Sequence, residues 1–131
     1  MALAQSGALN TVRFFEEAGS PPLVLQETAR SERTSVYKTS KPIKTDATSL
    51  FLLCSFTEHA EARGFTHMTV MLPKEGDDTY VVGFVGSADD DPAKVFGDQF
   101  DAQRLIGEKP GAIQRLLPKC PKKPSANPKG Q

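Results

Sequence analysis

An apolar stretch in the middle of the chain constrains the fold more than any other feature. Six of the seven residues 50–56 are apolar, and a helix this apolar needs burial on most of its sides. The preceding Thr45 or Asp46 can accept a hydrogen bond from an amide of the first helical turn. Gly64 stands where a left-handed residue commonly ends a helix. The sequence therefore predicts a central helix over Asp46–Arg63, with a polar second half.

Alternating apolar residues predict strands on both sides of this helix. Phe65–Leu72 and Thr79–Gly86 are separated by six turn-like residues, which favours an antiparallel hairpin. The second of these strands is apolar on both faces, as expected for a strand inside a sheet. Leu23–Thr28 and Thr34–Thr39 predict two further strands before the helix.

The remaining segments predict additional helices. Leu9, Val12 and the phenylalanines that follow recur at helical spacing within Ser6–Glu17, although their alternation also leaves a strand open. Asp90 or Asp91 can cap a helix over about 92–106, and a short helix follows at Ala112–Leu117. The element order predicts one α+β domain, with helices packed on one face of a small, mostly antiparallel sheet.

The formal net charge of zero conceals an uneven distribution. Residues 118–131 hold four lysines, four prolines and no acidic residue, so their net charge is +4 and that of residues 1–117 is −4. A proline-rich segment with few apolar side chains to bury is expected to be extended and mobile. The sequence therefore predicts a single domain followed by a mobile tail. The acidic body and the absence of Trp argue against nucleic-acid binding by that domain. The tail is expected to make at most weak contacts with anionic surfaces.

Two cysteines leave the cellular compartment open. A disulfide between Cys54 and Cys120 would close a loop of about half the chain and stabilise an exported protein. In the cytoplasm, Cys54 would instead be a buried small hydrophobe and Cys120 a free thiol. The start Ala2-Leu3-Ala4-Gln5 has the small-x-small form that ends a leader peptide, which favours a periplasmic or secreted location. No apolar run reaches the roughly 18 residues that a transmembrane helix needs.

Four side chains are candidates for nucleophilic catalysis. Ser55, Glu58 and His59 lie three and four positions apart on the predicted helix and share a face, and His67 follows on the next strand. A working triad needs its third group behind the base on a rigid scaffold, which consecutive helix positions rarely supply. The same residues are ordinary for the solvated end of a helix, so we favour a domain without catalysis and keep a small hydrolase as the alternative.

No metal or cofactor site is predicted. The chain has two histidines and neither an HExxH motif nor paired CxxC motifs. The acidic run 89–91 lacks the central glycine and the final glutamate of a calcium-binding EF-hand loop. The glycines form no phosphate-binding pattern.

The stretch Leu50–Met71, read as LFLLCSFTEHAEARGFTHMTVM, resembles a pattern of small bacterial secreted and periplasmic lipoprotein-like domains. In those proteins an apolar helix with Ala and Glu ends in Gly and an aromatic residue, and a short strand follows. The resemblance covers 22 residues and implies an envelope or secreted location, without a known catalytic activity or a site residue. Cys54 lies in mid-chain, so it does not match a lipid-attachment cysteine.

These observations predict a non-enzymatic protein-binding or accessory module of a bacterial envelope or secretion system. A cytoplasmic inhibitor or immunity protein with reduced thiols is a further alternative. An acidic surface speeds association with a basic partner. The expected contact surface is therefore an exposed sheet edge or the acidic loops, whose residues are Glu75, Asp77, Asp78, Asp89, Asp90 and Asp91.

Overall fold

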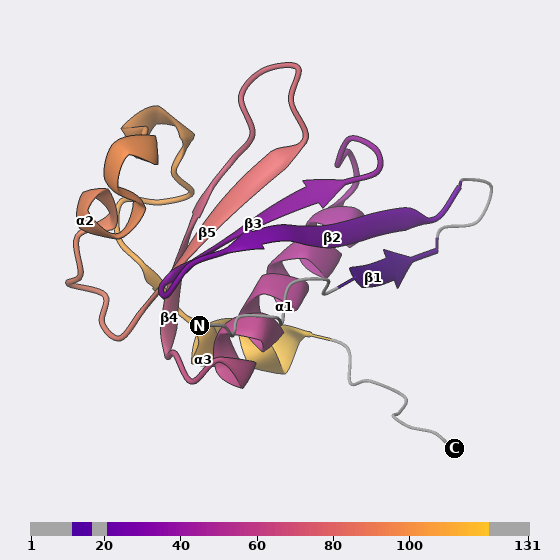
Figure 1. Cartoon of the computed structure of the whole chain (residues 1–131). Helices are drawn as coiled ribbons and strands as arrows, with labels where there is room; N and C mark the ends of the chain where they lie inside the picture. The colour runs from indigo at the N-terminus through magenta and orange to yellow at the C-terminus, as the bar shows by residue number, and fades with distance from the viewer. Residues whose placement is uncertain (1–11, 17–20, 121–131) are drawn as a thin grey trace, which may run out of the picture.

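The computed structural model describes residues 12–16 and 21–120, and its six strands form one antiparallel sheet (Figure 1). The strand order across the sheet is β1-β2-β3-β5-β4-β6, and every neighbouring pair is antiparallel. The strands are β1 (Val12–Phe15), β2 (Leu23–Arg30), β3 (Thr34–Thr39), β4 (His67–Met71), β5 (Thr79–Val85) and β6 (Gly111–Ala112).

Within residues 12–16 and 21–120, three α-helices and three short 3-10 helices accompany the sheet. They are α1 (Asp46–Ala62), α2 (Pro92–Phe96), η2 (Gly97–Gln99), η3 (Ala102–Arg104), α3 (Ile113–Leu116) and η4 (Leu117–Lys119). The main core lies between α1 and the sheet, where Leu52 and Phe56 of the helix pack with buried strand residues such as Val82. The predicted α+β class and the β4–β5 hairpin are confirmed.

Both ends of α1 have the caps that its sequence predicts. The side chains and backbone amides of Thr45 and Thr48 bond each other reciprocally at 3.1 and 3.2 Å, which forms a capping box. At the other end, the amide of Phe65 donates to the carbonyl of Ala60 at 2.9 Å, and Gly64 has a φ of +88°. This Schellman arrangement ends the helix one residue before the predicted boundary.

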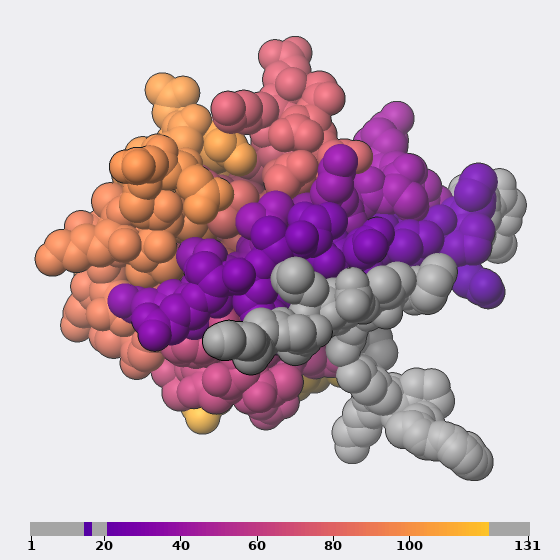
Figure 2. Space-filling view, in the orientation of Figure 1, coloured from indigo at the N-terminus to yellow at the C-terminus, as the bar shows by residue number. Residues whose placement is uncertain are grey.

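The second helix lies on the opposite face of the sheet from α1. Val82 and Phe84 of β5 face α1, whereas Val81 packs with Phe96 of α2. The prediction that the helices share one face is therefore wrong, because both faces of β5 are apolar and each is covered by a helix. Figure 2 shows the orange segment that includes α2 as a lobe beside the indigo and purple strands.

The helix predicted over about 92–106 ends at Phe96. Gly97 has a φ of +62°, a left-handed conformation that interrupts the helix. Asp101 then caps η3 instead of continuing a helix. Beyond η3, Leu105 forms a β-bridge with Met71, so pairing with the outer edge of β4 replaces helical hydrogen bonds.

The predicted helix over Ser6–Glu17 is wrong where the structure describes it. Residues 12–15 form β1, which pairs with Leu23–Gln26 of β2, so the alternation and not the helical spacing identified the element. Residues 6–11 and 17 lie outside the described residues.

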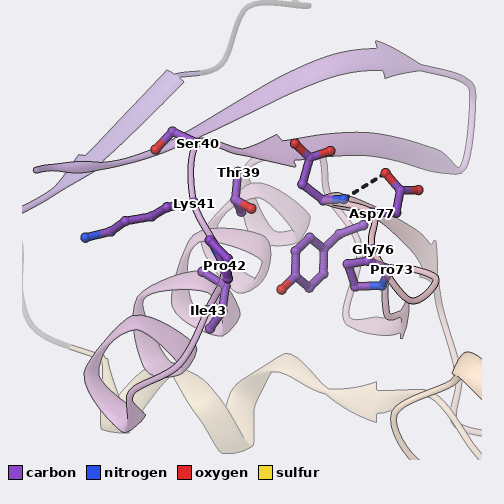
Figure 3. A pocket seen from close by; sticks show the side chains of 10 residues that line it. Thr39, Ser40, Lys41, Pro42, Ile43, Pro73, Gly76 and Asp77 are labelled. Atoms are coloured by element: carbon purple, nitrogen blue, oxygen red, sulfur yellow. Dashed lines mark hydrogen bonds between the residues drawn. The ribbon is translucent and has the colours of Figure 1, made fainter.

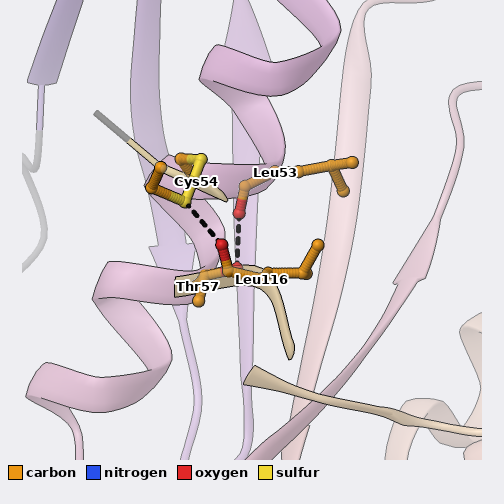
Figure 4. Close-up of a disulfide and its surroundings, with 5 residues drawn as sticks. Leu53, Cys54, Thr57 and Leu116 are labelled. Carbon is orange, nitrogen blue, oxygen red and sulfur yellow. Dashed lines mark hydrogen bonds between the residues drawn. A yellow bond between two sulfur atoms is a disulfide. The ribbon is translucent and has the colours of Figure 1, made fainter. Parts of the chain in front are cut away.

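A disulfide joins Cys54 in α1 to Cys120 after η4, with 5.6 Å between the two Cα atoms (Figure 4). The Sγ atom of Cys120 lies 3.2 Å from the carbonyl oxygen of Leu116; a bonded sulfur has no proton to donate, so this is a contact. Residues 118 and 119 therefore lie in η4, and Cys120 is held by the disulfide. The prediction that residues 118–120 begin an extended tail is wrong. The rest of that stretch, 121–131, lies outside the described residues.

We predict that Gly83→Ala weakens the packing of α2 on the sheet. A Cβ atom at Gly83 would lie 2.6 Å from Cγ1 of Val95 and 3.1 Å from Cγ2 of Thr69. Both belong to stiff β-branched side chains, so the free energy of unfolding should fall by roughly 1–3 kcal/mol. Denaturant titration measures this, with Gly86→Ala as the control because a Cβ there meets nothing within 4 Å. Equal losses in both variants would contradict the prediction.

Candidate functional site

The structure separates His67 from the other three side chains that were weighed as catalytic groups, which all lie on α1. His59 lies on α1, and its ring centroid is 5.6 Å from that of Phe84 on the inner face of the sheet. His67 of β4 pairs with Val85 of β5, and both side chains lie on the opposite face of the sheet. The Nδ1 atom of His67 is 2.9 Å from Oγ1 of Thr66. Ser55 is buried, with 4% of its surface exposed, and Glu58 is half-buried. The two histidines therefore cannot serve one site.

A buried ion pair that the sequence analysis missed lies beside His59. The carboxylate of Glu27 is fully buried and accepts hydrogen bonds from Nε and Nη2 of Arg30 at 2.8 and 2.7 Å. The hydroxyl of Ser35 donates to the same carboxylate at 2.7 Å. A signal was present, because the alternation Leu23, Leu25, Glu27 places this acid on the apolar side of β2.

A β-bulge brings the two partners of this ion pair to the same face. The register of β2 against β3 shifts between Glu27 and Ala29, so that Thr28 is an extra residue. Without the bulge, simple alternation would turn Arg30 to the opposite face from Glu27. With it, Arg30 lies opposite Ser35 and can form both bonds to the carboxylate.

His59 is bonded through both ring nitrogens. Its Nε2 lies 2.7 Å from Nη2 of Arg30, and its Nδ1 contacts the hydroxyl of Tyr37. A guanidinium can only donate, so Nε2 accepts and the Nδ1 of the neutral ring carries the proton that Tyr37 accepts. The nearer carboxylate oxygen of Glu27 is 3.9 Å from Nε2. This arrangement positions the ring but leaves neither nitrogen for a substrate.

The electrostatics of the cluster favour the charged pair. Burial opposes ionisation of Glu27, but the hydrogen bonds from Arg30 and Ser35 outweigh it and lower the pKa of this carboxyl below its usual value. The hydrogen bond that Arg30 donates to Glu27 raises the pKa of Arg30, and burial raises the pKa of Tyr37. Glu27 and Arg30 therefore remain ionised over the neutral range.

Arg63 extends the cluster to the β2–β3 turn. Its Nη2 donates to the carbonyls of Ser31 and Glu32 at 2.7 and 3.0 Å, and its Nη1 donates to Oγ of Ser35 at 3.0 Å. The guanidinium also lies over the ring of Phe84 at 4.9 Å. Since all these partners belong to the protein itself, we interpret the cluster as the connection between the end of α1 and the β2–β3 hairpin.

Two hollows on another side of the molecule form the candidate binding site. The larger, of about 500 Å³, lies between the β3–α1 loop and the β4–β5 turn (Figure 3). A second hollow, of about 210 Å³, lies between α1 and β4. Both are lined by Ile43 and Tyr80, so we treat them as one groove. The other lining residues are Thr39, Ser40, Lys41, Pro42, Pro73, Gly76, Asp77 and Asp78 in the larger hollow, and Ser49, Leu52, Leu53, Phe56, Val70, Leu72 and Ile106 in the smaller.

The two ends of the groove differ in chemistry. Leu72 and Ile106, at the apolar end, are 41% and 45% exposed, and they are the two large hydrophobic residues with high exposure among those described. Asp77 and Asp78 lie at the other end. A hydrogen bond from the backbone amide of Asp78 lowers the pKa of Asp77, which favours its charged form. The groove thus offers an apolar surface next to a carboxylate.

Tyr80 lies where the two hollows meet. The residue is 8% exposed, and its hydroxyl has no hydrogen-bond partner among the described residues. Burial raises the pKa of the hydroxyl, which keeps it a donor at neutral pH. On the facing wall, Lys41 points away from Asp77 (Figure 3), and its Nζ donates to the carbonyl of Pro21 at 2.8 Å.

The acidic residues predicted as one contact surface lie at two ends of β5. Asp77 and Asp78 line the groove and Glu75 belongs to the same turn, whereas 89–91 follow the far end of the strand. Seven strand residues separate the two loops by about 20 Å. In the second loop, Asp91 caps α2, Asp90 lies 3.7 Å from Arg33, and Asp89 lies 3.8 Å from Lys109.

Neither the described residues nor known proteins point to a more specific site. Within residues 12–16 and 21–120, no cluster of three His, Cys, Asp or Glu could hold a metal, and no helix is long and apolar enough to cross a membrane. Comparisons with protein-family models, curated proteins and solved structures find no match to this chain. Functional inference therefore rests on the groove and on the disulfide.

We predict that Glu27→Gln lowers the free energy of unfolding by about 3 kcal/mol near neutral pH, because it leaves Arg30 without a buried counterion. The pKa of Glu27 is lowered in the folded protein. The contribution of Glu27 to the free energy of unfolding is therefore complete at a pH above the ordinary glutamate pKa of about 4.3, and it declines as the pH falls below that value. Urea titrations from neutral to acidic pH should show this decline in the wild type and a smaller decline in the variant. The exposed Glu32→Gln is the control, and a matching loss there would contradict the prediction.

Proposed function

We propose that this protein is a non-enzymatic protein-binding module of a bacterial envelope or secretion system, and that its groove holds a segment of the partner. The single observation that carries the proposal is the groove itself, because it joins an exposed apolar end to a carboxylate end through Tyr80. A few anchor side chains in pockets supply most of the binding energy at protein interfaces. A hollow of about 210 Å³ lined by Leu53, Val70 and Ile106 is suited to one such anchor.

The arrangement of His59 favours binding over hydrolysis. Both ring nitrogens are engaged, one with Arg30 and the other with Tyr37. The groove also contains neither Ser55 nor a histidine among its lining residues. A nucleophile and base would need to lie where a substrate can reach both, and the lining of the groove offers no such pair.

The disulfide supports a periplasmic or secreted location. Disulfides persist in oxidising compartments and are rare in the cytosol, where thiols stay reduced. The Cys54–Cys120 bond links α1 to the chain after η4. It therefore also argues against a cytoplasmic inhibitor with free thiols.

We predict that the protein is oxidised in its native compartment. If it is recovered from there with acid quenching and then alkylated, it should show no reactive thiol before reduction and two reactive thiols after reduction. Mass spectrometry of the alkylated protein measures both counts. Two alkylated thiols in the unreduced sample would contradict the proposed location, and the same protein unfolded without reductant controls for buried cysteines.

We predict that Ile106→Arg abolishes partner binding without unfolding the protein. Ile106 is 45% exposed at the apolar end of the groove, so a charged side chain there blocks the hollow at little cost to the core. Crosslinked affinity capture from an envelope extract should recover a partner protein when the wild type is the bait. The same partner should be absent when the Ile106→Arg variant is the bait. Ala88→Arg adds the same charge at an exposed site beyond the far end of β5 and should retain the partner. Equal capture by all three proteins would overturn the groove as the binding site.

A further inference from the structure

Resting on the proposed function, we infer that the groove recognises an extended peptide segment with a bulky apolar side chain near a Lys or Arg. The apolar side chain enters the hollow between α1 and β4. A main-chain carbonyl of the segment accepts a hydrogen bond from Tyr80, and the cation lies at Asp77 and Asp78. The inference commits to a protein partner of this chemistry and to three distinct contacts.

The hydroxyl of Tyr80 is the observation that points to a ligand. Although the residue is largely buried, its hydroxyl oxygen is not one of the fully buried unpartnered atoms, so it opens to the groove and is available to a water molecule or to an acceptor of a ligand. Tyr80 is 8% exposed, has no partner among the described residues and lines both hollows. A carbonyl group of an extended segment would satisfy this donor, as main-chain groups commonly do in peptide recognition.

The apolar contact follows from the walls of the smaller hollow. Leu53 and Val70 line its sides, while Leu72 and Ile106 stand exposed. The amide of Ile106 donates to the carbonyl of Val70 at 2.9 Å, so the chain after η3 is held against β4 and supports this wall. An aromatic side chain would cover these surfaces at a small cost in conformational entropy, because it has few rotatable bonds.

The charge at the other end selects a cation. Asp77 is exposed, and its carboxylate accepts hydrogen bonds from the backbone amide of Asp78 and the hydroxyl of Thr79. Lys38 lies 3.9 Å from Asp78 and offsets part of that charge, while Lys41 is directed to Pro21. Lys38 acts on both carboxylates, but one lysine against two carboxylates leaves a net negative charge at this turn, and a Lys or Arg of the partner complements it.

The absence of Trp from the chain provides a direct binding assay. The probes are capped Gly/Ser peptides that carry one Trp and one Lys, placed one to three positions apart in either order. Trp emission then reports only on the peptide, and burial in the groove should shift and intensify it. We expect saturable binding of at least one spacing to the full chain, and about tenfold weaker binding when Glu replaces Lys. Binding should weaken with added salt.

Two variants separate the polar contacts from effects on folding. Tyr80→Phe removes a hydroxyl that has no hydrogen-bond partner among the described residues, so its unfolding midpoint should match the wild type, while peptide affinity falls about fivefold. Asp77→Asn/Asp78→Asn should reduce affinity about tenfold and abolish the preference for Lys over Glu. Asp98→Asn/Glu108→Gln removes the same charge from exposed residues outside the groove and should leave affinity unchanged.

The inference would be overturned by no saturable binding of any probe, by equal affinity for Lys and Glu peptides, or by unchanged affinity in Tyr80→Phe. Equal binding of N-acetyltryptophan amide would also overturn it, since the groove would then take any small amphiphile. The proposed function is tested separately by partner capture. Capture that depends on Ile106, together with failure of the peptides, rejects this specificity and leaves the protein-binding function standing.

Discussion

The burial of α1 against the sheet is the interaction on which the other features of the structure depend. The apolar first half of the helix fills the core with Leu52 and Phe56, and the disulfide at Cys54 holds the chain after η4 on the same helix. Where the first half of α1 passes β4, the chain after η3 does not close the surface, and the groove forms there. The position of the helix thus determines both the core and the candidate binding site.

The polar second half of α1 is packed by a different physical principle. Glu27 and Arg30 carry full charges into a desolvated region, which is unfavourable unless they are paired and hydrogen-bonded. Here the guanidinium, Ser35 and the ring of His59 supply those bonds, and Tyr37 positions the ring. A slip of β2 against β3 would move Ser35 away from the carboxylate of Glu27, so the cluster favours one register and one helix position over apolar alternatives.

The sequence predicted the elements whose signals are local. The helix at Asp46–Ala62 and the strand at Thr34–Thr39 follow from apolar periodicity and caps, and the structure places them within one residue. Predictions were wrong where pairing with another segment prevailed, as when Leu105 joined the edge of β4 and β1 paired with the following strand β2. Helical spacing in those segments was real, but a sheet edge supplied the hydrogen bonds instead.

The candidate site shows what each level of structure contributes. The sequence by itself determined the apolar helix, the acidic β4–β5 turn and the presence of two cysteines, because these depend on residue type and near neighbours. Only the tertiary structure decided that Asp77 shares a groove with Ile106, that His59 and His67 lie on opposite faces, and that the cysteines meet. Those outcomes depend on strand order, on the bulge in β2 and on the side of the sheet that each helix covers, none of which is encoded in a local pattern.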